Sequence, residues 1–175
     1  MIRILTLTIL IALTACSPAY YVTPEEAEEA TTLVFDNFTK ITKITLESGA
    51  HPRRHKLIYS KSALTQSESF EVQATYSDRD WIMAKSCYDS NGLDLQCKQD
   101  DFDKKIILHP IKGNQLKEIE IYSFPITEPR LREYAEKDGL NFKLIGVRGS
   151  AIFPIRPSHI TGFLNRVQRF RYSGE

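Results

Sequence analysis

An apolar run near the start of the chain limits what the remaining residues can become. The run covers Ile4 to Leu13, follows one positive charge at Arg3, and ends in small residues before Cys16. A helix needs about 20 apolar residues to span a bilayer, so this run is too short to cross one. Its length and flanks fit a secretory signal. We therefore expect the rest of the chain to fold outside the cytoplasm.

The segment Leu13-Thr14-Ala15-Cys16 resembles a lipobox, the cleavage and acylation signal of bacterial lipoproteins. That resemblance implies a signal peptide over residues 1–15, an acylated Cys16, a tether over residues 16–22, and one domain over residues 23–175. Each buried CH₂ of an acyl chain contributes about 0.8 kcal/mol, so several chains make a stable anchor. Ser17 follows instead of Asp, which in enterobacteria-like sorting implies the periplasmic face of the outer membrane. A plain signal peptide or short anchor is the alternative.

The composition of the mature chain indicates one globular domain. Removing residues 1–15 from the 175-residue chain leaves 160 residues, which is enough for one domain with a hydrophobic core. These residues carry 22 basic and 22 acidic side chains. A chain without net charge has no global field that attracts nucleic acid, so we expect no nucleic-acid partner.

Two cysteines remain for the domain. Cys87 and Cys97 lie on either side of Asp89-Ser90-Asn91-Gly92, a strong reverse-turn signal. Strands over Trp81–Tyr88 and Leu93–Lys98 would place the two sulfurs nearly opposite each other. In an oxidising compartment this arrangement predicts a disulfide. The alternatives are two free thiols, or a redox or metal pair, although the spacing is not C-x-x-C and no nearby His completes a zinc set.

Three segments are predicted to be helices. Thr23-Pro24-Glu25-Glu26 has the residues of a capping box, and apolar residues at helical spacing continue from Ala27 to Phe38. Thr127-Glu128-Pro129 opens a second helix over Arg130–Asp138. A third begins at Pro157, where Ile160, Phe163, Leu164 and Val167 form an apolar stripe.

Alternating apolar residues predict the strands. The clearest alternation covers Phe70–Tyr76, and we expect Trp81–Tyr88 to pair with it, with Trp81 packed on the sheet. The other predicted strands are Thr39–Leu46, Lys56–Ser60, Leu93–Lys98, Ile106–Leu108, Leu116–Phe124, Phe142–Val147 and Ala151–Ile155. The fold class is therefore α+β, a mainly antiparallel sheet of about seven or eight strands with three short helices packed on it.

The sequence contains no motif for catalysis or cofactor binding. It lacks G-x-S-x-G, H-E-x-x-H and a glycine-rich phosphate loop. The four histidines do not share a metal-binding spacing, and Asp100-Asp101-Phe102-Asp103 lacks the spacing of a calcium loop, so we expect a solvated loop there. We therefore predict no catalytic residue, no metal site and no cofactor.

The basic C-terminus is the candidate partner-binding segment. Arg166, Arg169 and Arg171 are interleaved with Phe170 and Tyr172. Such a pattern suits peptidoglycan carboxylates, phosphate head groups or an acidic protein. The alternative is a solvated helix end that the helix dipole favours.

The mature domain is also similar to a loose group of Gram-negative envelope proteins without assigned activity. The similar segments are Asp36-Asn37-Phe38-Thr39-Lys40, Trp81 with Tyr88-Asp89-Ser90-Asn91-Gly92, Gly146-Val147-Arg148-Gly149 and Ile160-Thr161-Gly162-Phe163-Leu164. The similarity implies turn and packing positions and transfers no catalytic residue.

The sequence thus predicts a non-enzymatic binding or structural module, anchored to the lipid bilayer through acylated Cys16. Its expected partner is an envelope protein or peptidoglycan, met by the exposed face of the sheet or by the basic terminal helix. The alternative is a small envelope hydrolase with its site in a cleft without a known motif. A surface-exposed adhesin is not distinguished from the first hypothesis.

Overall fold

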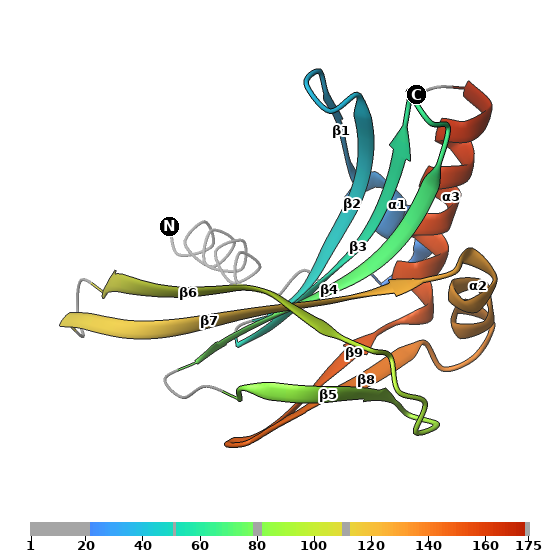
Figure 1. Ribbon diagram of the computed structural model, residues 1–175. Coiled ribbons are helices and arrows are strands. Elements are labelled where there is room, and N and C mark those ends of the chain that lie inside the picture. The colour runs from blue at the N-terminus through green and yellow to red at the C-terminus, as the bar shows by residue number, and fades with distance from the viewer. Residues whose placement is uncertain (1–21, 51, 79–81, 110–112, 174–175) are drawn as a thin grey trace, which may run out of the picture.

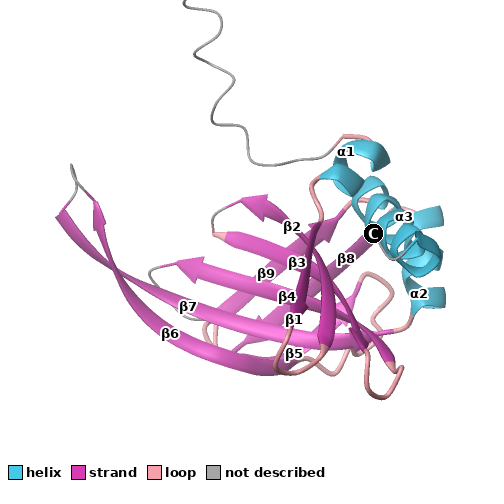
Figure 2. Ribbon diagram, turned by 90° about the horizontal axis from the view of Figure 1, so that it is seen from above, coloured by secondary structure: helices cyan, strands magenta, loops and turns pink. Residues whose placement is uncertain are grey.

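The computed structural model describes residues 22–50, 52–78, 82–109 and 113–173, with the backbone alone between residues 101 and 118. The lipobox, most of the tether, His51 and Trp81 lie outside the described residues. Nine strands form two antiparallel sheets, and three helices gather at one side of them (Figures 1 and 2). The α+β class and the antiparallel pairing are confirmed. The described part holds nine strands in two sheets, where the sequence predicted seven or eight in one.

The larger sheet has six strands in the order β1-β2-β3-β4-β7-β6. All neighbouring strands are antiparallel. In both ribbon views the β6–β7 hairpin extends away from the helices as a two-stranded arm. The bounds are β1 Thr32–Asp36, β2 Ile41–Ala50, β3 Arg53–Ser62, β4 Glu68–Asp78, β6 Lys98–His109 and β7 Gly113–Ile126.

The smaller sheet has three strands in the order β5-β8-β9, with bounds Ala84–Asp89, Leu140–Gly146 and Gly149–Ile155. Its inner face packs against the larger sheet through aromatic rings. The ring of Phe142 on β8 lies edge-on to Phe124 on β7, at 5.2 Å between centroids, and stacks on Phe153 of β9 at 5.1 Å. All three rings are buried. The core therefore lies between the two sheets and continues to the helices.

Helix α3, Pro157–Ser173, closes one end of this core. The predicted apolar stripe is confirmed, because Ile160, Phe163, Leu164 and Val167 are all buried. The Phe163 ring lies 6.4 Å from that of Phe70 on β4. The shorter helices α1, Pro24–Glu29, and α2, Glu128–Glu136, both pack against α3.

The first helix is shorter than predicted. The capping box at Thr23 and Glu26 is confirmed, but α1 ends at Glu29 and β1 follows, where the sequence predicted one helix as far as Phe38. The segment Thr31-Thr32-Leu33-Val34-Phe35 consists almost entirely of β-branched and aromatic residues, which favour strands. Its pairing with β2 overrides the helical recurrence of the apolar residues.

The partner predicted for the fourth strand was wrong. Strand β5 pairs with β8 in the smaller sheet, whereas the second edge of β4 pairs with β7, with Ala74 opposite Tyr122. The local alternation of a strand specifies which side chains face inward, but it does not specify a partner that lies tens of residues away. The expected meander therefore does not continue from β4 to β5.

The strand predicted over Leu93–Lys98 is mostly a loop, and the loop predicted over residues 100–103 belongs to β6. Of the predicted pairing between this segment and β5, the structure keeps one isolated bridge, between Tyr88 and Asp94. The carboxylate of Asp94 instead accepts a 2.8 Å hydrogen bond from the backbone N–H of Gln96, whose φ of +53° is not that of a strand. The ladder with β7 then begins at Lys98.

Candidate functional site

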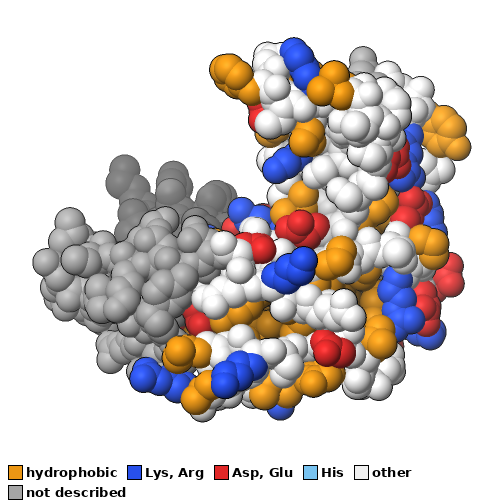
Figure 3. Space-filling view, viewed as in Figure 1, with side chains coloured by type: hydrophobic (Ala, Val, Ile, Leu, Met, Phe, Trp, Pro, Cys, Tyr) orange, Lys and Arg blue, Asp and Glu red, His pale blue; other side chains and the backbone are white. Residues whose placement is uncertain are grey.

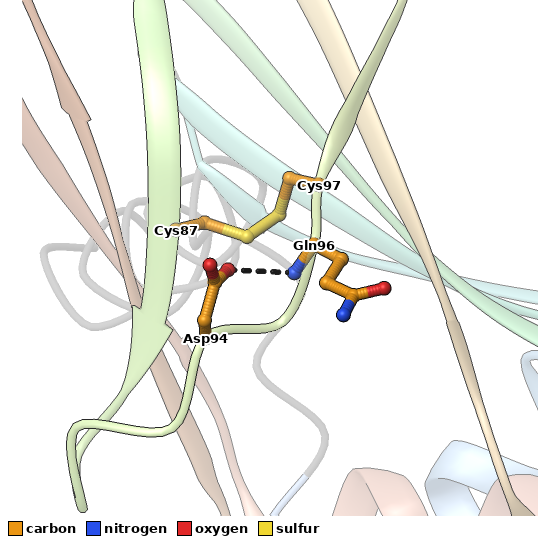
Figure 4. The surroundings of a disulfide bond; sticks show 4 residues. All are labelled: Cys87, Asp94, Gln96 and Cys97. Carbon is orange, nitrogen blue, oxygen red and sulfur yellow. Dashed lines mark hydrogen bonds between the residues drawn. A yellow bond between two sulfur atoms is a disulfide. The ribbon is translucent and has the colours of Figure 1, made fainter.

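The two domain cysteines lie in disulfide geometry, as predicted. Cys87 on β5 is fully buried, and Cys97 lies in the loop before β6 with its Cα atom 5.8 Å away (Figure 4). That separation is typical of a disulfide. The backbone N–H of Leu95 also donates to the Cys87 carbonyl at 2.9 Å. The pair therefore fastens the loop between β5 and β6 to the edge of the smaller sheet.

A buried carboxylate holds the other side of this loop. Asp89 accepts hydrogen bonds from the backbone N–H groups of Asn91 and Leu93, each at 2.9 Å, and from the Tyr134 hydroxyl of α2 at 2.7 Å. Burial raises the pKa of Asp89, but these hydrogen bonds and the nearby Arg130 guanidinium outweigh it and hold the pKa below its ordinary value. Asp89 is thus a structural acceptor that joins the turn to α2.

A second buried carboxylate joins the two sheets. Glu120 on β7 is 1% exposed and accepts hydrogen bonds of 2.8 Å from the backbone N–H groups of Ile82 and Met83. The Tyr122 hydroxyl also donates to Glu120 at 2.8 Å and accepts from the backbone N–H of Ala84. The carboxylate therefore holds in place the backbone that leads into β5. The sequence signal was Glu120 in register with Tyr122 and Phe124, on the face of β7 that the structure buries.

Two of the three candidate partner-binding arginines form ion pairs within the chain. The Arg171 guanidinium contacts Glu68 and lies 2.8 Å from Glu128, and it also lies 5.4 Å from the centroid of the Tyr59 ring. Burial raises the pKa of Tyr59 to about 12, and the Glu68 carboxylate adds to this effect. Arg169 lies 2.7 Å from Glu28 on α1. These contacts fix the end of α3 to the larger sheet and to the other helices.

Arg166 and Arg169 border a shallow hollow between α1 and α3, with a volume of about 320 Å³. Its other walls include Glu25, Glu28 and Glu29, so acidic and basic side chains face each other across it. A hollow with both charges does not select an acidic partner. The partner-binding role of the three arginines stays a prediction.

Two buried histidines lie where the larger sheet meets α3. His55 on β3 and His159 on α3 are 3% and 1% exposed, with ring centroids 6.2 Å apart. Burial, followed by the neighbouring His159, lowers the pKa of His55 to about 3. His55 therefore stays neutral at ordinary pH. It also borders a hollow of about 300 Å³ between the sheets, where the Arg53 guanidinium donates to the Ile152 carbonyl at 3.2 Å.

The outer face of the smaller sheet is apolar and basic. Here "outer face" means the exposed side chains of Met83, Lys85, Lys143, Ile145, Val147, Arg148 and Ile152. Lys143 on β8 lies opposite Ile152 on β9, and Val147 and Arg148 form the turn between the two strands. Figure 3 shows orange and blue side chains, with red ones beside them, in the lower part of the molecule, where this sheet lies. These seven residues include no acidic side chain, and the nearest exposed carboxylate along the β5 edge is that of Asp94, opposite Tyr88.

Within the residues that the structure describes, no group of three or more His, Cys, Asp or Glu side chains is placed to hold a metal ion. In the same residues, no helix is both long enough and apolar enough to cross a bilayer. His51 and Trp81 lie outside the described residues, as does the side chain of His109.

No protein-family model, curated protein or solved structure matches the chain.

Proposed function

We propose that the chain is a membrane-anchored envelope lipoprotein that acts as a non-enzymatic binding module, and that it meets its partner through the outer face of the smaller sheet. The observation that carries the proposal is the composition of this face. Ile145, Val147 and Ile152 are 39%, 64% and 49% exposed, beside three cations that form no ion pair among the described residues. Apolar surface with unmatched charge at its rim is typical of a protein-binding site.

The charge of the face selects the partner. Lys85, Lys143 and Arg148 attract carboxylates, which both acidic proteins and peptidoglycan present. The large apolar side chains between these cations favour a protein, because sugar chains bury little aliphatic surface. We therefore assign the face to an acidic envelope protein. Anchorage through Cys16 would hold the module at the membrane where such a partner is met.

The hydrolase alternative has less support from the described cavities. A hydrolase site needs titratable side chains that converge on a cavity within reach of the reacting atom. The hollow between the sheets contains His55 and Arg53 but no carboxylate in its described lining. The buried carboxylates Asp89 and Glu120 are both occupied by hydrogen bonds that hold backbone in place.

Photo-cross-linking in intact cells tests the binding face. Benzoylphenylalanine replaces Ile152 in the full chain, and the matched control replaces Leu93, which is 48% exposed in the loop beyond β5. We expect one specific protein adduct at position 152. The double variant Lys143→Glu/Arg148→Glu should reduce the yield of this adduct by about tenfold, which corresponds to a loss of about 1.4 kcal/mol of binding free energy. The variant Arg166→Glu should leave it unchanged.

Three results would contradict the proposal. An adduct that Arg166→Glu abolishes and Lys143→Glu/Arg148→Glu spares would assign binding to the terminal helix instead. An adduct with isolated cell wall alone would assign the face to peptidoglycan. The absence of any adduct at position 152, with normal membrane fractionation, would remove the binding face and make a screen for hydrolase activity the next experiment.

A further inference from the structure

Among the described residues, the three most exposed large apolar side chains lie at the same end of the molecule, away from the smaller sheet. Phe38 in the β1–β2 turn is 99% exposed, Tyr172 at the end of α3 is 84% exposed, and Leu64 in the β3–β4 turn is 75% exposed. Single exposed apolar residues are common on protein surfaces. Three of them at the same end of a small domain give that end an apolar character.

A hydrogen bond and an ion pair hold these three elements together. The backbone N–H of Ala63 donates to the Lys40 carbonyl at 2.9 Å, which joins the two turns. The ion pair between Arg171 and Glu68 fixes the end of α3 beside the start of β4. In Figure 1 both turns and the end of α3 lie at the upper end, and Figure 3 shows orange side chains with blue ones beside them there. We call Phe38, Leu64 and Tyr172 the apolar end.

We propose that the apolar end inserts into the surface of the same bilayer that holds acylated Cys16, and so orients the domain; this inference rests on the proposed lipid anchor. Side chains of this kind suit an interface, because aromatic rings favour the head-group level of a bilayer. Lys40 and Lys43, which follow Phe38 along the chain, are exposed and are attracted to anionic head groups. The Asp36 carboxylate, which accepts from the backbone N–H of Phe38, is the acidic group beside them.

The length of the tether allows this arrangement. The start of α1 packs at Gly162, where an added Cβ atom would lie 2.2 Å from the Pro24 carbonyl oxygen. From Gly162 the helix rises about 15 Å to Tyr172, and β1 covers a similar distance of about 17 Å toward Phe38. The residues 17–22 span at most about 20 Å when fully extended. The anchor and the apolar end can therefore reach one bilayer surface together.

This orientation points the outer face of the smaller sheet away from the membrane. In Figure 1 the β8–β9 turn lies at the end of the molecule opposite the β1–β2 turn. A lipid-facing end and a partner-facing sheet then occupy opposite ends of one small domain.

Quenching by brominated lipid tests the orientation. The full acylated chain carries Phe38→Trp or, as the matched control, Val147→Trp, and each is reconstituted into phosphatidylethanolamine–phosphatidylglycerol vesicles with brominated acyl chains. The emission of Trp81, measured in the wild-type protein, is subtracted as background. We expect a loss of about twofold or more in the emission added at position 38, because that ring would lie at the acyl boundary. The emission added at position 147 should be unchanged.

The outcomes separate this inference from the anchor on which it rests. Equal quenching at positions 38 and 147, in protein that floats with the vesicles, would overturn the orientation and leave the anchor standing. Blue-shifted emission at position 38 without quenching would mean that protein, such as a second copy paired at the β1 edge, covers the apolar end, and would overturn it too. Wild type that does not float with the vesicles, as expected of Cys16→Ala, would contradict the anchor itself.

Discussion

Glu28 on α1 and Arg169 on α3 form an ion pair of 2.7 Å, so the helix next to the tether is fastened to the helix that closes the core. In the proposed lipoprotein, a force on the anchor would reach the domain first through α1 and its contact with α3. Gly162 allows this contact, because its missing side chain lets the backbone of α1 approach α3 directly.

Gly162→Ala should lower the thermal midpoint. Alanine is favoured over glycine in a helix interior by about 1 kcal/mol. At this position, however, the new Cβ would lie 2.2 Å from the Pro24 carbonyl oxygen and 2.7 Å from the Ala27 Cβ, so α1 must move. Differential scanning calorimetry measures whether the thermal midpoint falls or rises. Asn165→Ala, at an exposed position on the same helix, is the control and should leave the midpoint unchanged or raise it slightly. A Gly162→Ala protein more stable than wild type would refute the close contact.

Arg171→Ala should destabilise the fold more than Arg166→Ala. Arg171 contacts two carboxylates and the faces of two rings, Tyr59 and Phe70. Such a network is worth about 1–2 kcal/mol at a partly exposed site, whereas isolated surface charges contribute about 0.5 kcal/mol or less. Urea denaturation compares the two variants. Equal unfolding midpoints would mean that the Arg171 network contributes nothing measurable.

His55 should make the fold sensitive to mild acid. Its pKa is about 3 in the folded chain and near 6.5 when the chain is unfolded. Because the folded pKa is the lower one, this contribution to stability is complete above about pH 6.5 and is lost as the pH falls toward 3. Between pH 6.5 and 5 the expected loss is about 2 kcal/mol.

The matched variant for this effect is His55→Gln, which removes the titrating group. Urea unfolding at pH 6.5 and 5.0 should show a smaller fall in stability for the variant than for wild type. The carboxylates Asp89 and Glu68, whose pKa values are held below their ordinary range, lose their contributions at still lower pH. Identical pH profiles for the two proteins would show that His55 is not the acid-sensitive group.

Reduction of the Cys87–Cys97 pair should lower stability by about 2–3 kcal/mol, the value expected for a disulfide that closes a loop of this size. No Lys or Arg lies between the two cysteines, so trypsin leaves both in the peptide Ser86–Lys98. That peptide should resist alkylation until it is reduced. Alkylation of both thiols in the folded, unreduced protein would establish two free cysteines instead.

Local patterns predicted the parts of the fold that depend on local chemistry. The alternation over Phe70–Tyr76 identified β4, and the turn at Asn91 and Gly92 identified the cysteine pair. The capping box at Thr23 identified the start of α1. In each case the residues that specify the element lie within a few positions of one another, so a local sequence pattern is enough to predict it.

The parts that were missed depend on distant partners. Strand β1 is the exception, because it pairs with the adjacent β2 and was missed through the helical recurrence of its apolar residues. Strand β5 belongs to the smaller sheet because β8 pairs with it more than fifty residues later. The carboxylate of Glu120 is buried where it accepts hydrogen bonds from two distant backbone N–H groups and from the Tyr122 hydroxyl, and no local motif predicts this arrangement. The outer face likewise brings together residues from β5, β8 and β9. Its composition depends on the pairing of these three strands, which the sequence pattern does not specify.

The most direct test of the central claim is the mass of the N-terminal tryptic peptide of the chain purified from membranes. In the mature chain the first Lys or Arg after Cys16 is Lys40, so this peptide should run from Cys16 to Lys40. A lipid-anchored module predicts that peptide with acyl chains on Cys16, and a Cys16→Ala protein that leaves the membrane fraction. An unmodified peptide that begins at another residue, in protein that still functions and fractionates normally, would contradict the lipoprotein assignment.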